Sequence, residues 1–222
     1  MKSKILVITS LFFSSLAFSY DDDTQIWLNL TAQSQLKVDS GFNGYLEMQV
    51  RRSNEEQKIY EYLIRPAVFY KTDQLGSFFI GTLKRFDYAT KENENRHWFQ
   101  WSDSFKFDSN KLTLRLRQEH RDIKNIPEIS WRTRLQVRFQ NDNLTFFESF
   151  KPFLATELFY NLNEANKNLP VGLRQSRTAM GVNHKMTDQL QLEISYIGII
   201  INNVDREDNF NHVLNTALTL SF

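Results

Sequence analysis

Apolar and polar residues alternate with a period of two along most of this chain, which is the pattern of β-strands with two different faces. The clearest example lies within 112–121, where the leucines are Leu112, Leu114 and Leu116. The charged residues between and after them are Arg115, Arg117, Glu119 and Arg121. Because the same alternation recurs in 130–140 and 189–201, the sequence predicts an all-β protein.

Eleven segments have this pattern or a β-rich composition. They are 25–36, 42–52, 58–71, 77–88, 96–107, 112–121, 130–140, 151–160, 176–184, 189–201 and 212–222. Most have about 10 residues, the length that a tilted strand needs to cross a membrane. Single-chain bacterial barrels normally have an even number of strands. We therefore expect 10 to 12 strands, with one miscounted or one more hidden in 144–160, and a local irregularity at Pro66, which cannot donate a ladder hydrogen bond.

The connections between these segments alternate in length. Short turns rich in Asp, Asn, Ser and Gly are expected at 38–41, 72–76, 108–111, 141–143 and 186–189. Longer polar connections are expected at 53–57, 89–95, 122–128, 161–170 and 202–209. Outer-membrane barrels have short periplasmic turns and longer outer loops. This order predicts an antiparallel transmembrane β-barrel, although alternation alone also fits a secreted β-sandwich or a soluble, lipocalin-like barrel.

The first nineteen residues are typical of an export signal. Lys2 and Lys4 precede an apolar run, 5–18, that is too short to span a bilayer. The run ends near Ala17, Phe18 and Ser19, which suit signal-peptide cleavage after Ser19. An N-terminal membrane anchor is the alternative, and the acidic residues 21–23 favour export instead. We expect a cleaved signal peptide at 1–19 and one barrel domain at 20–222.

The last segment, together with the export signal and the strand lengths, favours a membrane barrel over a soluble sandwich. Leu214, Leu218, Leu220 and Phe222 share one face, and the other face carries Asn215, Ala217, Thr219 and Ser221. A terminal strand of this kind, closed by Phe222, resembles the assembly signal of bacterial outer-membrane barrels. It predicts a bacterial outer-membrane location, with membrane lipid and the barrel assembly machinery as partners.

Composition narrows the classes further. The chain has 222 residues, with 27 Lys and Arg against 26 Asp and Glu, and removing Lys2 and Lys4 leaves a mature charge near −1. This balance argues against a nucleic-acid partner, and the absence of cysteine excludes a disulfide framework or a thiolate site. The 19 Phe fit a barrel ringed by aromatic residues. The interfacial belts are expected among Trp27, Trp98, Trp101, Trp131, Tyr60, Tyr62 and Tyr88.

If the leucines of 112–121 face lipid, the charged residues between them face the lumen, because Arg or Lys on the lipid face costs about 2–4 kcal/mol at mid-membrane. The predicted basic wall comprises Arg115, Arg117, Arg132, Arg134 and Arg138, and the predicted lumen carboxylates are Glu47, Glu61, Glu119, Glu157 and Glu193. These charges either form a salt-bridge network that fills a narrow barrel or an electropositive pore wall that selects anions. The sequence leaves both interpretations open.

The sequence gives little support for a catalytic site or a metal site. A hydrolytic barrel needs a Ser–His pair oriented by a third polar group, and His97, His120, His184 and His212 show no such pattern; His120 and His212 fall on the apolar face. His97 and Asp103 are too loosely spaced for a metal site. We expect no catalytic residue, no metal and no cofactor.

Several segments together resemble a bacterial outer-membrane family catalogued as domain of unknown function 2490. They are residues 26–28, EMQVRR from Glu47, ENRHWFQWSDSFKF from Glu94, LTLRLRQEHR from Leu112, WRTRLQVRFQ from Trp131, KPFLATELFYNL from Lys151 and LQLEISYIG from Leu190. The resemblance implies an outer-membrane barrel and brings no activity or catalytic residues. We favour a small channel or transporter for polar or anionic solutes. The alternatives are a structural or envelope-maintenance barrel with a closed lumen and, third, a lipid-modifying enzyme.

Overall fold

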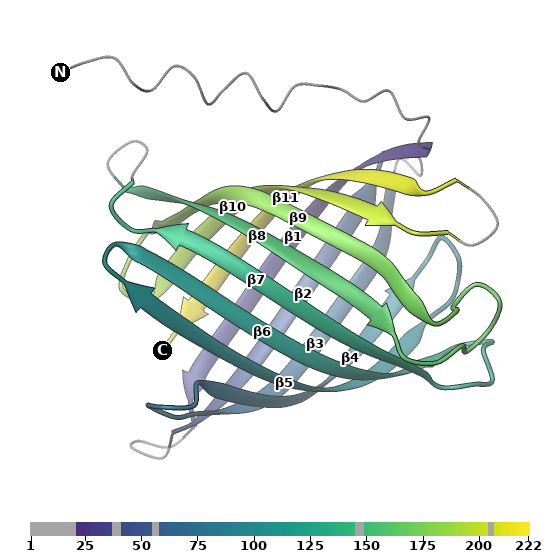
Figure 1. Ribbon diagram of the computed structural model, residues 1–222, viewed down its shortest axis with the longest axis horizontal. Helices are drawn as coiled ribbons and strands as arrows, with labels where there is room; N and C mark the ends of the chain where they lie inside the picture. Colours follow the sequence, from purple (N-terminus) through teal and green to yellow (C-terminus); the bar gives the residue numbers. More distant parts are fainter. Residues whose placement is uncertain (1–20, 37–40, 55–57, 145–148, 204–206) are drawn as a thin grey trace.

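The computed structural model describes residues 21–36, 41–54, 58–144, 149–203 and 207–222, so the predicted signal peptide lies outside the described residues. These residues form eleven strands that close into a barrel (Figure 1). The strands are β1 (Asp21–Gln35), β2 (Phe42–Ser53), β3 (Lys58–Lys71), β4 (Ser77–Asp87), β5 (Glu94–Phe107), β6 (Asn110–Ile123), β7 (Ser130–Asn141), β8 (Phe150–Asn161), β9 (Gly172–Lys185), β10 (Leu190–Ile201) and β11 (Asn209–Ser221). The all-β barrel predicted from the alternation is confirmed.

The strand number is odd, and the barrel closes through one parallel pair. Consecutive strands pair as antiparallel neighbours, whereas β1 and β11 run parallel, from Asp21 opposite Asn209 to Gln33 opposite Ser221. The expected hidden strand in 144–160 is not present among the described residues, which place β8 alone there. Parallel closure removes the need for an even number, because β1 and β11 can then start at the same end of the barrel.

The ladder is irregular at three places. Between β3 and β4 no residue pair forms at Arg65 or Pro66, although the register is the same on both sides, as expected for a residue that lacks an N–H. The register of β2 with β3 shifts between Arg51 and Arg52, and that of β8 with β9 shifts beside Tyr160. Both shifts are bulges near one end of the barrel, where such features are common.

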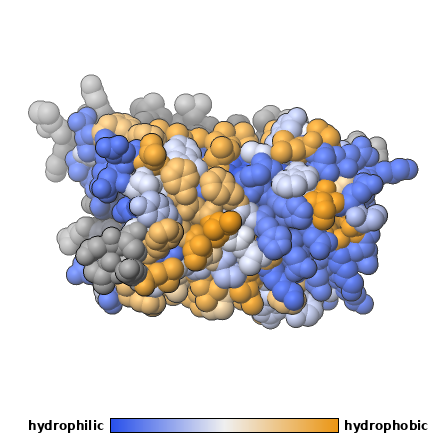
Figure 2. Space-filling model, turned by 90° about the horizontal axis from the view of Figure 1, so that it is seen from below, coloured by the Kyte–Doolittle hydropathy of each residue, from blue (hydrophilic) through white to orange (hydrophobic). Residues whose placement is uncertain are grey.

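The outward faces of the strands are apolar. On β1, exposed Ile26, Leu28 and Leu30 alternate with inward side chains, and Leu214 and Leu220 continue this surface on β11. Figure 2 shows an apolar band across the visible face, with polar surface on either side of it. Among the described residues, no helix is long and apolar enough to cross a membrane.

Trp27 and Trp98 point into the lumen, so their predicted place in the outer aromatic belts is wrong. Each indole is 4% exposed, whereas Trp131 is exposed on the outer surface. Trp98 fits inside because Gly81 leaves space, since a Cβ at Gly81 would lie 2.6 Å from the indole. Guanidinium groups also cover both rings, with Arg51 3.9 Å from the Trp27 centroid and Arg117 4.3 Å from that of Trp98.

The two ends of the barrel differ in their connections. The carboxyl-terminal end, which holds Phe222, has connections from two residues (108–109) to eight (142–149) long, and we name it the turn end. At the opposite, loop end they run from four residues (54–57) to ten (162–171). Residues 55–57, in the connection expected at 53–57, and 145–148, which follow the turn expected at 141–143, lie outside the described residues. β1 starts at the loop end (Figure 1).

Candidate functional site

The five arginines predicted to form a basic wall come together on β6 and β7. The β6–β7 register places Arg117 opposite Arg134, Arg115 opposite Gln136, and Thr113 opposite Arg138. Arg117 and Arg134 are buried, whereas the side chains of Arg115 and Arg138 are 23% and 25% exposed. Because strands six and seven are hairpin neighbours and alternate in phase, their inward faces form one continuous surface.

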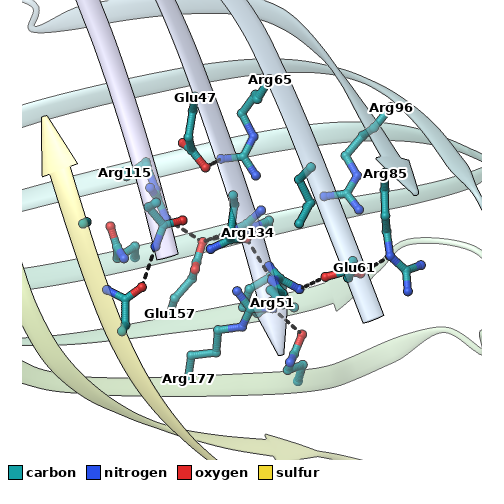
Figure 3. A pocket seen from close by; sticks show the side chains of 18 of the residues that line it. Glu47, Arg51, Glu61, Arg65, Arg85, Arg96, Arg115, Arg134, Glu157 and Arg177 are labelled. Carbon is teal, nitrogen blue, oxygen red and sulfur yellow. Dashed lines mark hydrogen bonds and ion pairs between the residues drawn. The ribbon is translucent and has the colours of Figure 1, made fainter. Parts of the chain in front are cut away.

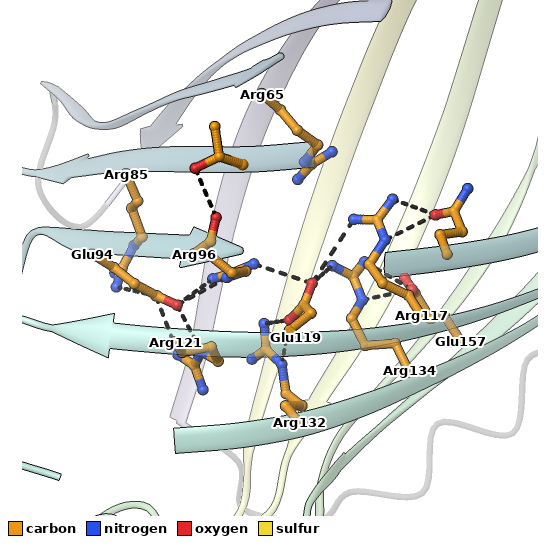
Figure 4. Close-up of polar contacts among 12 residues, drawn as sticks. Arg65, Arg85, Glu94, Arg96, Arg117, Glu119, Arg121, Arg132, Arg134 and Glu157 are labelled. Atoms are coloured by element: carbon orange, nitrogen blue, oxygen red, sulfur yellow. Dashed lines mark hydrogen bonds and ion pairs between the residues drawn. The ribbon is translucent and has the colours of Figure 1, made fainter. Parts of the chain in front are cut away.

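Glu119, on the same wall, is the centre of a buried ion-pair cluster (Figure 4). Its side chain is fully buried, and four guanidinium groups surround it. Arg132 and Arg134 contact its two oxygens at 2.6 and 2.9 Å, while Arg96 and Arg117 lie at 3.5 and 3.8 Å. The carboxylate thus compensates several positive charges at once, so part of the predicted basic wall is neutralised within the wall itself.

A second cluster, which the sequence analysis did not identify, surrounds Glu94 at the start of β5. Arg96 and Arg121 contact this buried carboxylate at 2.8 and 2.7 Å, and Arg85 lies at 3.8 Å. Arg96 also reaches Glu119, so it joins the two clusters into one network on β4 to β7 (Figure 4). The network fills this side of the lumen with paired charges.

The other predicted carboxylates also face the lumen, each with an arginine. Glu157 accepts from Arg115 and Arg134 at 2.7 Å, and Glu193 pairs with Arg138 at 2.9 Å. The remaining contacts are Glu47 with Arg65 and Tyr45, and Glu61 with both Arg51 and Arg85. The five predicted glutamates, like Glu94, are therefore bound to guanidinium groups from their own or other strands.

A central cavity of about 460 Å³ remains between these side chains, and all eleven strands contribute residues to its lining (Figure 3). Of the described residues that line it, ten are arginines and five are glutamates. The cavity is therefore polar and carries an excess of positive charge despite the ion pairs. Such a space is suited to water and to small anions rather than to apolar ligands.

Aromatic rings inside the lumen support several of the arginines. The Phe159 ring has the guanidinium carbons of Arg134 and Arg177 at 4.4 and 4.6 Å, and Arg138 lies 3.6 Å from the Phe153 centroid. The face of an aromatic ring attracts a cation without consuming its N–H donors. These contacts help to hold the guanidinium groups in place without using their hydrogen-bond donors.

The four histidines lie on the outward faces, away from this cavity. His97 and His120 are neighbours on β5 and β6, His184 stacks on Phe150, and His212 contacts Tyr196. Within the described ranges, no group of three His, Cys, Asp or Glu residues could hold a metal ion. The polar chemistry of the interior is therefore carried by arginine and carboxylate groups.

Several residues of the lumen were not predicted from the sequence, although the same alternation marks them. Arg51 follows Glu47 and Gln49 on the inward face of β2, and Arg96 follows Glu94 on β5. The remaining unpredicted arginines of the cavity are Arg65, Arg85 and Arg177, whereas Arg121 was already expected on the inward face. Their positions in the alternation along each strand would have identified all of them as inward residues. Their ion-pair partners, however, depend on contacts across the lumen.

The fold and its interior define a porin-like β-barrel with a charged lumen. The chain belongs to the family described as "Protein of unknown function (DUF2490)", whose model matches residues 24–211, so the resemblance noted in the sequence is confirmed. No curated protein matches the chain. Among solved structures, a crystal structure of the NanC porin is similar, with a TM-score of 0.51 and 11% identity over 90% of this chain and 99% of that one. At this identity the similarity concerns the fold alone.

Proposed function

We propose that this chain is a bacterial outer-membrane barrel that acts as a small channel for polar, preferentially anionic solutes. The observation that carries the proposal is the central cavity, lined by all eleven strands and by twice as many arginines as glutamates. Rings of Arg or Lys select anions in known pores. The porin fold of the similar solved structure agrees with this reading.

The outer-membrane location rests on three features. The outward faces are apolar, the barrel is closed and therefore has no unpaired sheet edge, and the chain begins with an export-type segment. We place the turn end in the periplasm and the loop end outside, following the usual asymmetry of such barrels. Phe222 would engage the assembly machinery, and membrane lipid would cover the apolar band; no nucleic-acid partner is proposed.

A structural barrel with a closed lumen is the second candidate, and the cluster around Glu119 favours it. The carboxylate is completely buried among guanidinium groups, as expected where ion pairs fill a narrow barrel. In that case the central cavity would hold trapped water without connecting the two ends. A lipid-modifying activity receives no support from the outward histidines.

Planar bilayer recordings of the purified, refolded protein test the channel directly. In a salt gradient we expect discrete conductance steps and a reversal potential displaced toward the anion. Folding would be checked in the same preparation by slower gel migration after boiling. Folded protein that leaves the bilayer silent would contradict the channel and support the closed barrel, and a cation-selective current would contradict the proposed selectivity.

A further inference from the structure

Five residues form a neck between the central cavity and the loop end of the barrel. A second cavity of about 340 Å³ lies at the loop end, where its lining includes Asp87, Ala89 and Thr90. The two cavities share Arg51, Glu61, Arg85, Gln175 and Arg177, and we name these residues the neck. A solute that enters from the loop end meets the neck before the central cavity.

Positive charge exceeds negative charge at the neck. Glu61 is its single carboxylate, and both Arg51 and Arg85 contact it. Arg85 has a further partner in Asp87, just outside the neck. Arg177, by contrast, forms no ion pair with any residue that the structure describes. Its Nε is buried without a hydrogen-bond partner, and one terminal nitrogen reaches Gln175 at 3.5 Å.

The neighbouring carboxylate contacts other arginines and forms no ion pair with Arg177. Glu157 lies opposite Arg177 in the β8–β9 ladder, but its Oε1 already accepts from Arg115 and Arg134, each at 2.7 Å. Figure 3 shows Arg177 beside Arg51, with Glu157 turned toward Arg115 and Arg134. A buried guanidinium without an anion is unfavourable unless something else compensates it.

Two aromatic rings contact the Arg177 guanidinium but provide no acceptor for its N–H groups. Its guanidinium carbon lies 4.6 Å from the Phe159 centroid and 5.0 Å from that of Trp27, while Arg51 covers Trp27 at 3.9 Å. Two guanidinium groups from β2 and β9 therefore meet at one indole, with Gln175 beside them. Their planar arrays of N–H donors match carboxylate and phosphate oxygens.

We propose that the neck is a binding station for the carboxylate or phosphate group of a solute, with Arg177 as the principal donor and Arg51 assisting. This inference rests on the proposed channel, for which it specifies the solute class and the point of recognition. A passing oxyanion provides the anionic partner that Arg177 does not have among the described residues. Binding is transient, because release toward the central cavity transfers the anion to further arginines.

Calorimetric titration of the refolded protein in detergent tests the station, with inorganic phosphate and acetate as separate probes at constant ionic strength. The wild type should bind at least one of them saturably, and the preferred probe distinguishes phosphate from carboxylate. Arg177→Gln should weaken binding by about tenfold or more, the loss expected for a charge-assisted contact. Absence of saturable binding of both anions to the wild type would overturn the proposal.

Lys185→Gln is the control, because it removes one positive charge from the same strand, in an exposed ion pair with Asp188 that lies outside both the neck and the central cavity. Its anion affinity should stay within about twofold of the wild type, since a distant charge is largely screened. Equal losses in the two variants would indicate a general electrostatic effect and no local station. If Arg177→Gln fails to refold, Arg177→Lys replaces it. Unchanged anion affinity in Arg177→Lys would contradict the role of the planar N–H donors of the guanidinium group.

Bilayer recordings separate this inference from the channel itself. Saturable, Arg177-dependent binding in a protein that does not conduct would retain the station and reject the channel. A conducting pore whose anion selectivity and phosphate block are the same in Arg177→Gln as in the wild type would retain the channel and reject the station.

Discussion

Replacing Glu119 by Gln tests whether the buried ion-pair cluster stabilises the barrel. The substitution keeps the size and shape of the side chain and removes its charge. Four guanidinium groups then lie within a buried space without their shared anion, two of them at 2.6 and 2.9 Å from the substituted group. The arginines would repel one another where little water can screen them.

The expected loss is about 3–5 kcal/mol in the free energy of unfolding, the cost of breaking a buried ion pair by removing one partner. Glu193→Gln provides the matched control. Glu193 forms one ion pair, with Arg138 at 2.9 Å, and both side chains are about a quarter exposed to solvent. A pair of this kind contributes about 0–1 kcal/mol, so the two variants should differ by several kcal/mol.

Urea unfolding of both variants and the wild type in lipid vesicles measures this difference. Tryptophan fluorescence is a suitable signal because Trp27 and Trp98 lie inside the barrel. Gel migration before and after boiling checks that each variant starts folded. If Glu119→Gln loses no more free energy of unfolding than Glu193→Gln, the cluster is not the stabilising element that its geometry indicates.

Three further tests concern the membrane orientation, the assembly signal and the selectivity. Leu116→Arg, on the outward face in the middle of β6, should lower the free energy of unfolding by about 2–4 kcal/mol. Gln136→Arg, in the cavity lining, should lower it less, and the reverse order would refute the assigned faces. Phe222→Asp should lower the amount of barrel in the outer-membrane fraction without lowering its unfolding free energy, because this side chain is exposed; normal levels would contradict the signal. Arg115→Gln combined with Arg138→Gln should shift the reversal potential toward cations in bilayer recordings, and an unchanged value would exclude these residues from selectivity.

The alternation of residues was sufficient to predict the strands and their inward faces. The arginines of β6 and β7 share one wall because that arrangement follows from phase along two neighbouring strands. Trp98 was misassigned because an aromatic residue suits either the membrane interface or a lumen with room for it. The decisive neighbour, Gly81, belongs to another strand and lies 17 positions earlier.

The ion pairs across the lumen could not be predicted from the sequence. Which carboxylate each arginine contacts depends on barrel diameter and register, so Glu119 could not be identified as a shared centre from its position alone. Arg177 illustrates the same limit, since its lack of an ion pair among the described residues becomes visible once Glu157 is seen to contact Arg115 and Arg134. Parallel closure was likewise unexpected, because the even-number rule describes single-chain bacterial barrels in general.

The parallel seam has a consequence for the order of folding. Every other strand contact joins neighbours in the chain, whereas the seam joins residues as distant as Ile26 and Leu214. It can form only after the last strand is available, and closing so long a loop is entropically costly and slow. Until then the sheet has two free edges, which can pair with other strands. Parallel pairing is also slightly weaker per residue than antiparallel pairing. We therefore expect the contact between β1 and β11 to be the last to form and the first to separate.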